Sequence, residues 1–254
     1  MSWKSLFKFK RLTLNNCLVY LPLSRTNCDL ADLWFGEGRN YDILVNNWGD
    51  SGFFQDRNPE FYFQIKEHKF RTLVKLYSEQ FKVIGKYNYV MCPDPDLKIR
   101  VEDINKLFAM AKLYDLDLCQ PSITGHLNHP SLAPIENRNI LIRHMNLIEP
   151  MCPIFSRKAM MSCLWTFSLS YSAWGLDFVW PMIVSNSKKS NVGVINSLSV
   201  EHTRPCVSIS SVFSNGKTPW DEHQETLAAF GVTNTPRTYC TTPRLLSAKS
   251  ILMG

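Results

Sequence analysis

The chain has 254 residues, 45% of them apolar, and carries a formal net charge of +6. This composition permits one sizeable domain, and no apolar run reaches membrane-spanning length. The modest positive charge suits anionic ligands, but no recognition helix, zinc finger or RNA-binding motif accompanies it, so we expect no nucleic-acid partner. Eight cysteines without a CxxC pair predict free thiols in a reducing, cytoplasmic compartment and no cysteine-bound zinc.

The two ends of the sequence differ from its middle. Residues 1–14 mix aromatic and basic side chains without the apolar core of a signal peptide, and we interpret them as a leader or an edge segment. The alternative is that these residues make peripheral contact with the inner face of a membrane. Residues 15–235 are expected to form a single domain. The basic, acid-free residues 236–254 are expected to be a loosely held tail.

The first half of the sequence alternates between strand-like and helix-like patterns. Short runs rich in aromatic and branched residues, bounded by polar or glycine-containing breaks, predict strands at residues 17–23, 41–49, 61–65, 87–92 and 116–121. Apolar residues at helical spacing predict helices at about residues 66–81 and 101–114. This order predicts an α/β fold with a predominantly parallel sheet.

The second half is less regular. Residues 125–139 show little periodicity and predict a mobile loop, and residues 140–155 form an apolar stretch interrupted by charged residues. Ser156 is expected to cap a helix that continues through residue 167. Residues 192–195 and 198–200 predict two short strands.

The clearest helix signal of the second half follows a serine-rich loop at residues 206–217. Thr218 is placed as an N-cap, Pro219 at the first helical position and Asp221 three residues after the cap, which is the pattern of a capping box. Gly231 predicts the end of this helix.

Two carboxylates one residue apart follow the buried strand at residues 87–92. Asp94 and Asp96 flank Pro95, whose ring favours an extended backbone at Asp94. In an extended chain, residues i and i+2 point to the same side, roughly 7 Å apart. Such oxygen donors suit a Mg²⁺ or Mn²⁺ ion that also holds a diphosphate, at the strand end where α/β sheets bind ligands. The same spacing is also typical of a Pro-Asp turn with solvated acids.

Three further groups are candidates for binding or catalysis. Asp177 follows an aromatic-glycine turn, where a semi-apolar pocket would raise its pKa and suit a general base; the alternative is a helix N-cap. His202 could ligate a metal and Arg204 a phosphate, although most lone histidines do neither. Lys69, near a predicted helix start, could offset phosphate charge or simply lie on a solvated face.

Several common catalytic motifs are absent from the sequence. It contains no GxGxxG dinucleotide fingerprint, no P-loop and no GxSxG nucleophile elbow. Hydride transfer, P-loop phosphoryl transfer and α/β-hydrolase chemistry are therefore disfavoured.

A set of short motifs recurs in a recognisable order. They are DPDL, LCQPSIT, EPMCPIFSRKAM, WGLDFVWP, VGVINSLSVEHTRP and a helix that begins PWDE. Together they resemble a poorly characterised family of proteins assigned as glycosyltransferases, found in bacteria and plants. The resemblance runs from about Cys17 to Gly231. It implies a core similar to the nucleotide-sugar-binding GT-A fold, with a Rossmann-like, mixed but mainly parallel sheet flanked by helices.

The resemblance also implies roles for particular residues. Asp94-Pro95-Asp96 resembles the DxD motif, in which Asp96 would hold the divalent metal and Asp94 would contact the metal, sugar or ribose. His202 is similar to the late histidine that often completes this metal site. Asp177 resembles the acid that serves as base in inverting members, and Trp174 would pack on the donor or acceptor sugar.

The nucleotide and the metal are implied in the same way. Leu23, Ser24 and Arg25, after the first strand, would line the nucleotide, with Lys69 and Arg204 beside its phosphates. The implied cofactor is Mn²⁺ or Mg²⁺, and the loops at residues 125–139 and 206–217 would act as lids.

Three functions are open at this point. The first is a metal-dependent glycosyltransferase that moves a sugar from a nucleotide-diphosphate donor to a glycan or lipid-linked acceptor. The second is a non-catalytic glycan- or protein-binding module on the same fold. The third is another metal-dependent phosphate enzyme, such as a nucleotidyltransferase.

Overall fold

The computed structural model describes residues 15–24, 29–49, 54–137, 139–185, 191–206 and 208–243. The expected leader at residues 1–14 and the predicted nucleotide contact Arg25 lie outside these residues.

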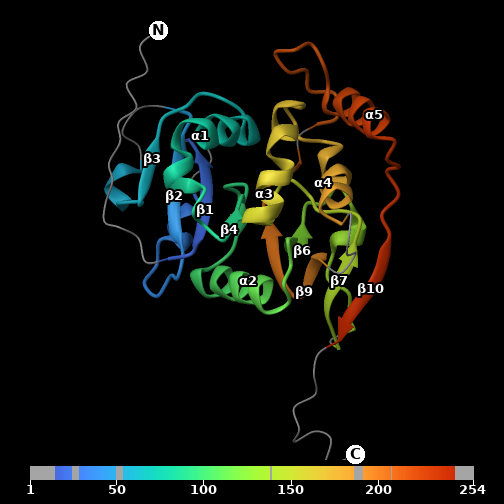
Figure 1. Cartoon of the computed structure of the whole chain (residues 1–254), viewed down its shortest axis with the longest axis horizontal. Coiled ribbons are helices and arrows are strands. Elements are labelled where there is room, and N and C mark those ends of the chain that lie inside the picture. Colours follow the sequence, from blue (N-terminus) through green and yellow to red (C-terminus); the bar gives the residue numbers. More distant parts are fainter. Residues whose placement is uncertain are drawn as a thin grey trace, which may run out of the picture.

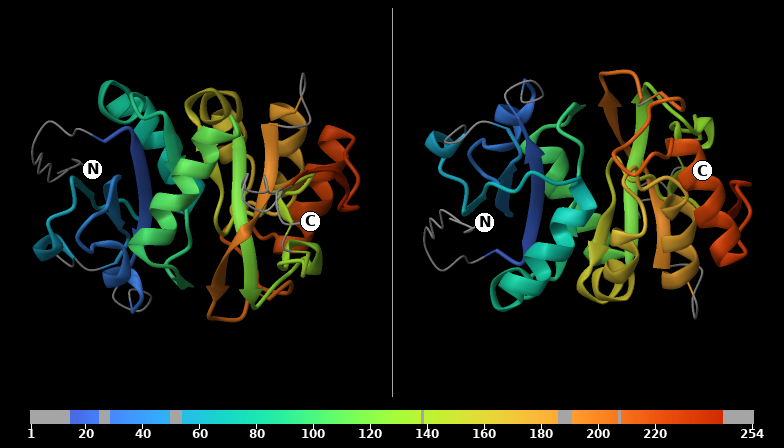
Figure 2. Two further views of the ribbon diagram at one scale, coloured as in Figure 1. Left: turned by 90° about the horizontal axis from the view of Figure 1, so that it is seen from below. Right: turned by 90° about the horizontal axis from the view of Figure 1, so that it is seen from above.

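The described strands form one mixed sheet. They are β1 (Cys17–Leu23), β2 (Asp42–Asn47), β3 (Phe61–Phe63), β4 (Tyr89–Met91), β5 (Leu97–Lys98), β6 (Leu118–Gly125), β7 (Ile140–Met145), β8 (Ile154–Ser156), β9 (Val192–His202) and β10 (Thr238–Pro243). Their order across the sheet is β10-β7-β9-β6-β8-β4-β1-β2-β3, and β5 pairs with β9 (Figure 1). The long strands β6 and β9 run side by side, as Figure 2 shows.

The two halves of the sheet differ in strand direction. β4, β1, β2 and β3 are parallel neighbours, as the sequence predicts. The short strand β8 then inserts antiparallel to both β4 and β6. β6 and β9 are parallel, whereas β7 and β10 add antiparallel pairings. The α/β fold with a mixed sheet is confirmed, and the antiparallel pairings lie in the half of the chain with the weaker periodicity.

Helices cover both faces of the sheet. They are α1 (Lys69–Ile84), α2 (Val101–Leu113), α3 (Arg157–Cys163), α4 (Leu176–Val184) and α5 (Pro219–Phe230). Residues of α1, α3, α4 and α5 share one hydrophobic cluster, and those of α2 belong to a second. β1 lies between the two clusters because successive side chains of a strand point to opposite faces. Leu18 and Tyr20 accordingly join the first cluster, whereas Val19 and Leu21 join the second.

Two of the predicted helix starts are confirmed in atomic detail. The Ser156 hydroxyl accepts a hydrogen bond from the Ala159 amide at 3.1 Å. Thr218 and Asp221 form the reciprocal bonds of a capping box, in which the Thr218 hydroxyl accepts from the Asp221 amide and the Asp221 carboxylate from the Thr218 amide. These contacts satisfy amides that would otherwise lack a partner at the helix start.

Three segments differ from the sequence expectation. The helix after Ser156 ends at Cys163 and continues as a 3₁₀ helix, Leu164–Ser168. The two short strands predicted at residues 192–200 are the single strand β9, whose pairing with β6 shifts in register after Ile195. Residues 238–243, expected in a loosely held tail, pair with β7 as β10. In the described ranges, no helix has both the length and the apolar character needed to cross a membrane.

Candidate functional site

The candidate site lies at the carboxyl ends of β4, β6 and β9. Asp94 and Asp96 follow β4, and His202 ends β9. β6 ends at Gly125 with φ +81°, and an added Cβ there would lie 2.3 Å from the carbonyl oxygen of His202. Only glycine lets the two strand ends approach this closely. The next amide, that of His126, donates to the same oxygen at 3.1 Å and holds the two ends together.

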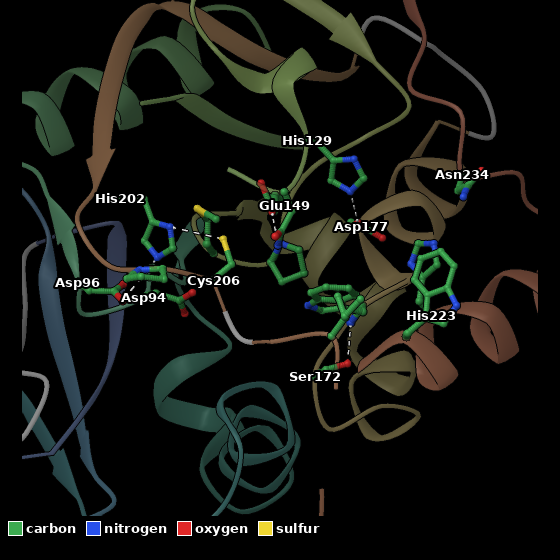
Figure 3. Close-up of a pocket in the computed structure, with 17 residues that line it drawn as sticks. Asp94, Asp96, His129, Glu149, Ser172, Asp177, His202, Cys206, His223 and Asn234 are labelled. Atoms are coloured by element: carbon green, nitrogen blue, oxygen red, sulfur yellow. Dashed lines mark hydrogen bonds and ion pairs between the residues drawn. The ribbon is translucent and has the colours of Figure 1, made fainter. Parts of the chain in front are cut away.

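A cavity of about 520 Å³ brings the predicted residues together (Figure 3). Asp94, Asp96 and His202 line one end, and Asp177 lines the other. A second cavity of about 780 Å³ adjoins it and extends past Lys69 and the ends of β1 and β2. The residues common to both walls are Asp94, Pro150, Ser172 and Trp174. The two cavities therefore form neighbouring compartments of one cleft.

Asp96 and His202 form a contact at the first end of the cleft. The Asp96 Oδ2 lies 3.4 Å from His202 Nε2, and Nδ1 of the same ring lies 2.8 Å from the carbonyl of His126. Burial opposes ionisation of Asp96, but the His202 ring and its charge hold the pKa of Asp96 below its usual range. Burial likewise opposes the charge on His202, while Asp96 and the His126 carbonyl raise the pKa of His202. The second oxygen of Asp96, Oδ1, is buried without a hydrogen-bond partner.

Asp94 contacts a lysine instead of the histidine. The Lys69 ammonium donates to Asp94 Oδ1 and to the Pro150 carbonyl, each at 2.7 Å. Burial raises the pKa of Asp94, and the Lys69 charge opposes that rise. Lys69 thus places a cation at the junction of the two cavities.

Asp177 forms an ion pair at the other end. Its carboxylate Oδ2 lies 3.4 Å from His129 Nε2, and its Oδ1 accepts from the Phe178 amide at 3.1 Å. Burial opposes the charge on His129, but the Asp177 contact raises the pKa of His129 above its usual range. Asp177 lies in the first turn of α4, where Gly175 is the N-cap, so the N-cap alternative is wrong.

Glu149 is a site residue that the sequence analysis did not identify. It lines the cavity between the His202 end and the Asp177 end (Figure 3) and is only 4% exposed. Its Oε1 accepts from the Asn128 amide group at 3.3 Å, and its Oε2 is buried without a partner. Burial raises the pKa of Glu149 to about 7. The available sequence signal was a lone carboxylate that interrupts an apolar stretch.

Aromatic rings form the wall beside Asp177. Trp220 stacks on His223 with ring centroids 5.2 Å apart, and Trp174 meets the same imidazole edge-on at 6.4 Å. All three line the cavity, and Trp220 is 46% exposed. Flat apolar faces next to polar groups suit ligands with one apolar and one polar side.

The remaining predicted contacts lie elsewhere. The Leu23 side chain is fully buried in the second hydrophobic cluster, so it cannot line a ligand. Ser24, the other described residue of the predicted nucleotide contact, is also buried, at 4% exposed. Arg204 forms an ion pair with Asp29 at 2.5 Å and lines a separate hollow that shares Asp96 with the first cavity. Among the described residues, no three His, Cys, Asp or Glu side chains gather as a metal-binding group.

The comparisons with known proteins concern family and fold. A family described as "Protein of unknown function (DUF707)" matches residues 143–233, which include Glu149, Asp177 and His202. No curated protein matches the chain in sequence.

Two solved structures are similar in fold. S. aureus TarS 1–349 in complex with UDP-GlcNAc has a TM-score of 0.53 at 11% identity, covering 84% of this chain and 65% of that one. GalNAc-T7 with UDP, GalNAc and Mn²⁺ has a TM-score of 0.59 at 9% identity, covering 84% of this chain and 48% of that one. This chain therefore spans only part of the length of either protein, and identities this low show similarity of fold alone. The chain has an α/β fold with a mixed sheet, structurally similar to the GT-A glycosyltransferases, and its residues 143–233 match a family of unknown function.

Proposed function

We propose that the chain is a glycosyltransferase that uses a nucleotide-diphosphate sugar as donor. One observation carries the proposal. A single cavity at the carboxyl edge of the sheet has the Asp96–His202 pair at one end and the buried Asp177 at the other. The fold is similar to TarS, whose structure holds UDP-GlcNAc, and to GalNAc-T7, whose structure holds UDP and Mn²⁺.

Asp96 and His202 fit a divalent cation. If His202 Nδ1 donates its proton to the His126 carbonyl, Nε2 is left as the ligating nitrogen. The buried, unpartnered Oδ1 of Asp96 supplies an oxygen of the type that Mg²⁺ and Mn²⁺ prefer. A bound ion of this kind would act as a Lewis acid on the leaving diphosphate.

Lys69 adds a second positive charge where the cavities meet. Its side chain is 14% exposed and is fixed by Asp94 and the Pro150 carbonyl. An ammonium held in this way can offset the charge that develops on a departing phosphate without first reorganising. The larger cavity, past Lys69, is the compartment for the nucleotide.

Asp177 is the proposed base for the acceptor. As the acceptor oxygen bonds to the anomeric carbon, the bond between that carbon and the diphosphate breaks, and the hydroxyl proton passes to the Asp177 carboxylate. When the imidazole of His129, 3.4 Å away, is neutral, it can then receive this proton. The acceptor is proposed to be a glycan or a lipid-linked sugar.

A thermal-shift experiment with UDP, alone and with MnCl₂, tests the donor site. Ligand at 100 times its Kd should add about 2.7 kcal/mol of stability, which is several degrees in Tm. Asp96→Asn should remove the Mn²⁺-dependent part of the shift. Asp103→Asn, on the exposed side of α2, should keep it.

The alternatives predict different outcomes. A wild-type protein that gains no stability from any nucleoside diphosphate with Mn²⁺ would contradict the proposal. Binding without sugar release or transfer would favour a glycan- or protein-binding module. Release of pyrophosphate or inorganic phosphate without sugar transfer would favour another phosphate enzyme.

A further inference from the structure

Glu149 is a buried carboxylate that the proposed chemistry does not use. Its position is fixed from two sides, because its amide donates to Gln120 Oε1 at 2.5 Å and its Oε1 accepts from Asn128 at 3.3 Å. Its Oε2 is buried with no hydrogen-bond partner in the described protein, and the residue itself lines the cavity. A buried oxygen without a partner destabilises the protein, so a bound ligand that supplies a hydrogen bond would recover stability.

The location of Glu149 indicates which part of a donor it would meet. The charges of both His202 and Asp177 act on its carboxyl group, and Figure 3 draws Glu149 between them. With the diphosphate at the His202 end and the acceptor hydroxyl at the Asp177 end, the group between them is the sugar that is transferred.

The charges of the cavity wall restrict that sugar further. Of the described residues that line the cavity, four are carboxylates and none is lysine or arginine; the carboxylates are Asp94, Asp96, Glu149 and Asp177. Lys69 is already paired with Asp94, and His129 with Asp177. A sugar with its own carboxylate would meet no lysine or arginine among the described lining residues, and such like-charge contacts give specificity by repulsion.

We propose that Glu149 selects the transferred group: it hydrogen-bonds a hydroxyl of an uncharged sugar and disfavours a uronic acid. This inference rests on the proposed function. With a pKa of about 7, Glu149 is mostly ionised at pH 8, where it accepts from a sugar hydroxyl and repels a carboxylate.

The test compares three ligands by calorimetry on the full chain with MnCl₂: UDP, UDP-glucose and UDP-glucuronate. The last two differ only at C6, where glucuronate carries a carboxylate. The wild type should bind UDP-glucose at least about tenfold more tightly than UDP-glucuronate, a difference of about 1.4 kcal/mol. Glu149→Gln should leave UDP affinity within about twofold, weaken UDP-glucose about five- to tenfold and narrow the gap to UDP-glucuronate.

Two further variants keep the result interpretable. Glu149→Asp retains the charge but withdraws it by one methylene, so it should weaken UDP-glucose while keeping the discrimination against UDP-glucuronate. Glu79→Gln, on the exposed side of α1, is the matched control and should behave as the wild type.

The outcomes separate the two proposals. If UDP binds but Glu149→Gln and Glu149→Asp leave both sugar nucleotides unchanged, the role of Glu149 is overturned and the donor site stands. Equal wild-type affinity for UDP-glucose and UDP-glucuronate also overturns it. Failure of the wild type to bind any nucleoside diphosphate overturns the donor site, and the role of Glu149 with it.

Discussion

The imidazole of His129 lies 3.4 Å from the carboxylate of Asp177, and the two side chains differ in their access to water. The Asp177 side chain is 7% exposed, whereas that of His129 is 24% exposed. A proton taken up by Asp177 can therefore reach solvent through the imidazole. The pair thus combines the buried proposed base with a more accessible group that can carry the proton away when it is neutral.

Replacing Asp177 tests the base directly. Asp177→Asn should lower the rate of sugar transfer, or of donor hydrolysis with water as acceptor, roughly 10²- to 10⁴-fold. The fold should persist, because the asparagine oxygen can still accept from the Phe178 amide. UDP affinity should change less than twofold, since the proposed nucleotide compartment lies past Lys69. Turnover at the wild-type rate would rule out Asp177 as the base.

The pKa of His129 reports on the same pair without any substrate. Asp177 raises this pKa against the effect of burial, so Asp177→Asn should lower it, as followed by NMR titration of the imidazole C–H signals. His68, which lines the other cavity, should titrate unchanged. Because the folded pKa is raised, the pair's stabilisation is complete below the unfolded value of about 6.5 and is lost as pH rises through the folded pKa. An unchanged His129 titration in the variant would contradict the ion pair.

Local patterns predicted the regular elements because their causes are local. β1 is buried on both faces and was expected at the residues where it occurs, and the cap at Thr218 depends only on side chains within one turn. The contact between Asp96 and His202 was anticipated from strand ends and the family resemblance, and the structure brings them to 3.4 Å.

Other parts of the site depend on contacts distant in sequence. Glu149 interrupts an apolar stretch, and a solvated loop would give the same pattern. The fold instead holds its segment against β6 and α4: the Glu149 amide donates to Gln120, and the Ile148 amide donates to the Asp177 carbonyl. Leu23 is at a strand end yet faces the core, and Arg204 pairs with Asp29, which is far away in the sequence.

The glycine at the end of β6 should be essential for positioning His202. Gly125→Ala forces a side chain into a left-handed conformation and 2.3 Å from the His202 carbonyl, so either β6 or β9 must shift. The conformational cost alone is about 1–2 kcal/mol, and the clash adds to it. We expect Tm to fall by several degrees and the Mn²⁺-dependent affinity for UDP to fall with it.

Gly216→Ala is the matched control for this substitution. Gly216 has a similar φ of +78°, but no atom lies within 4 Å of the position that an added Cβ would take, so only the conformational cost applies. It should lower Tm less than Gly125→Ala and leave UDP binding intact. Equal losses in the two variants would show that strand-end packing at His202 contributes nothing.

The buried Glu149 makes stability depend on pH in a predictable direction. Its carboxyl ionises near 4.5 when the chain is unfolded and at about 7 when folded, mainly because of burial. Between these values the folded protein binds more protons, so stability falls as pH rises from 4.5 to 7 and then levels off. The difference corresponds to about 3 kcal/mol.

Glu149→Gln removes this ionisation, so its stability relative to the wild type should increase with pH. Thermal melts at pH 5 and pH 8 should show the Tm of the variant rising by several degrees against the wild type at the higher pH. Other titrating groups are common to both proteins and largely cancel in this comparison. Glu79→Gln, which alters an exposed carboxylate, should show no such pH-dependent difference. A constant difference between Glu149→Gln and the wild type would mean that Glu149 ionises alike in the folded and unfolded chains, and therefore that its carboxyl is hydrated in the cavity.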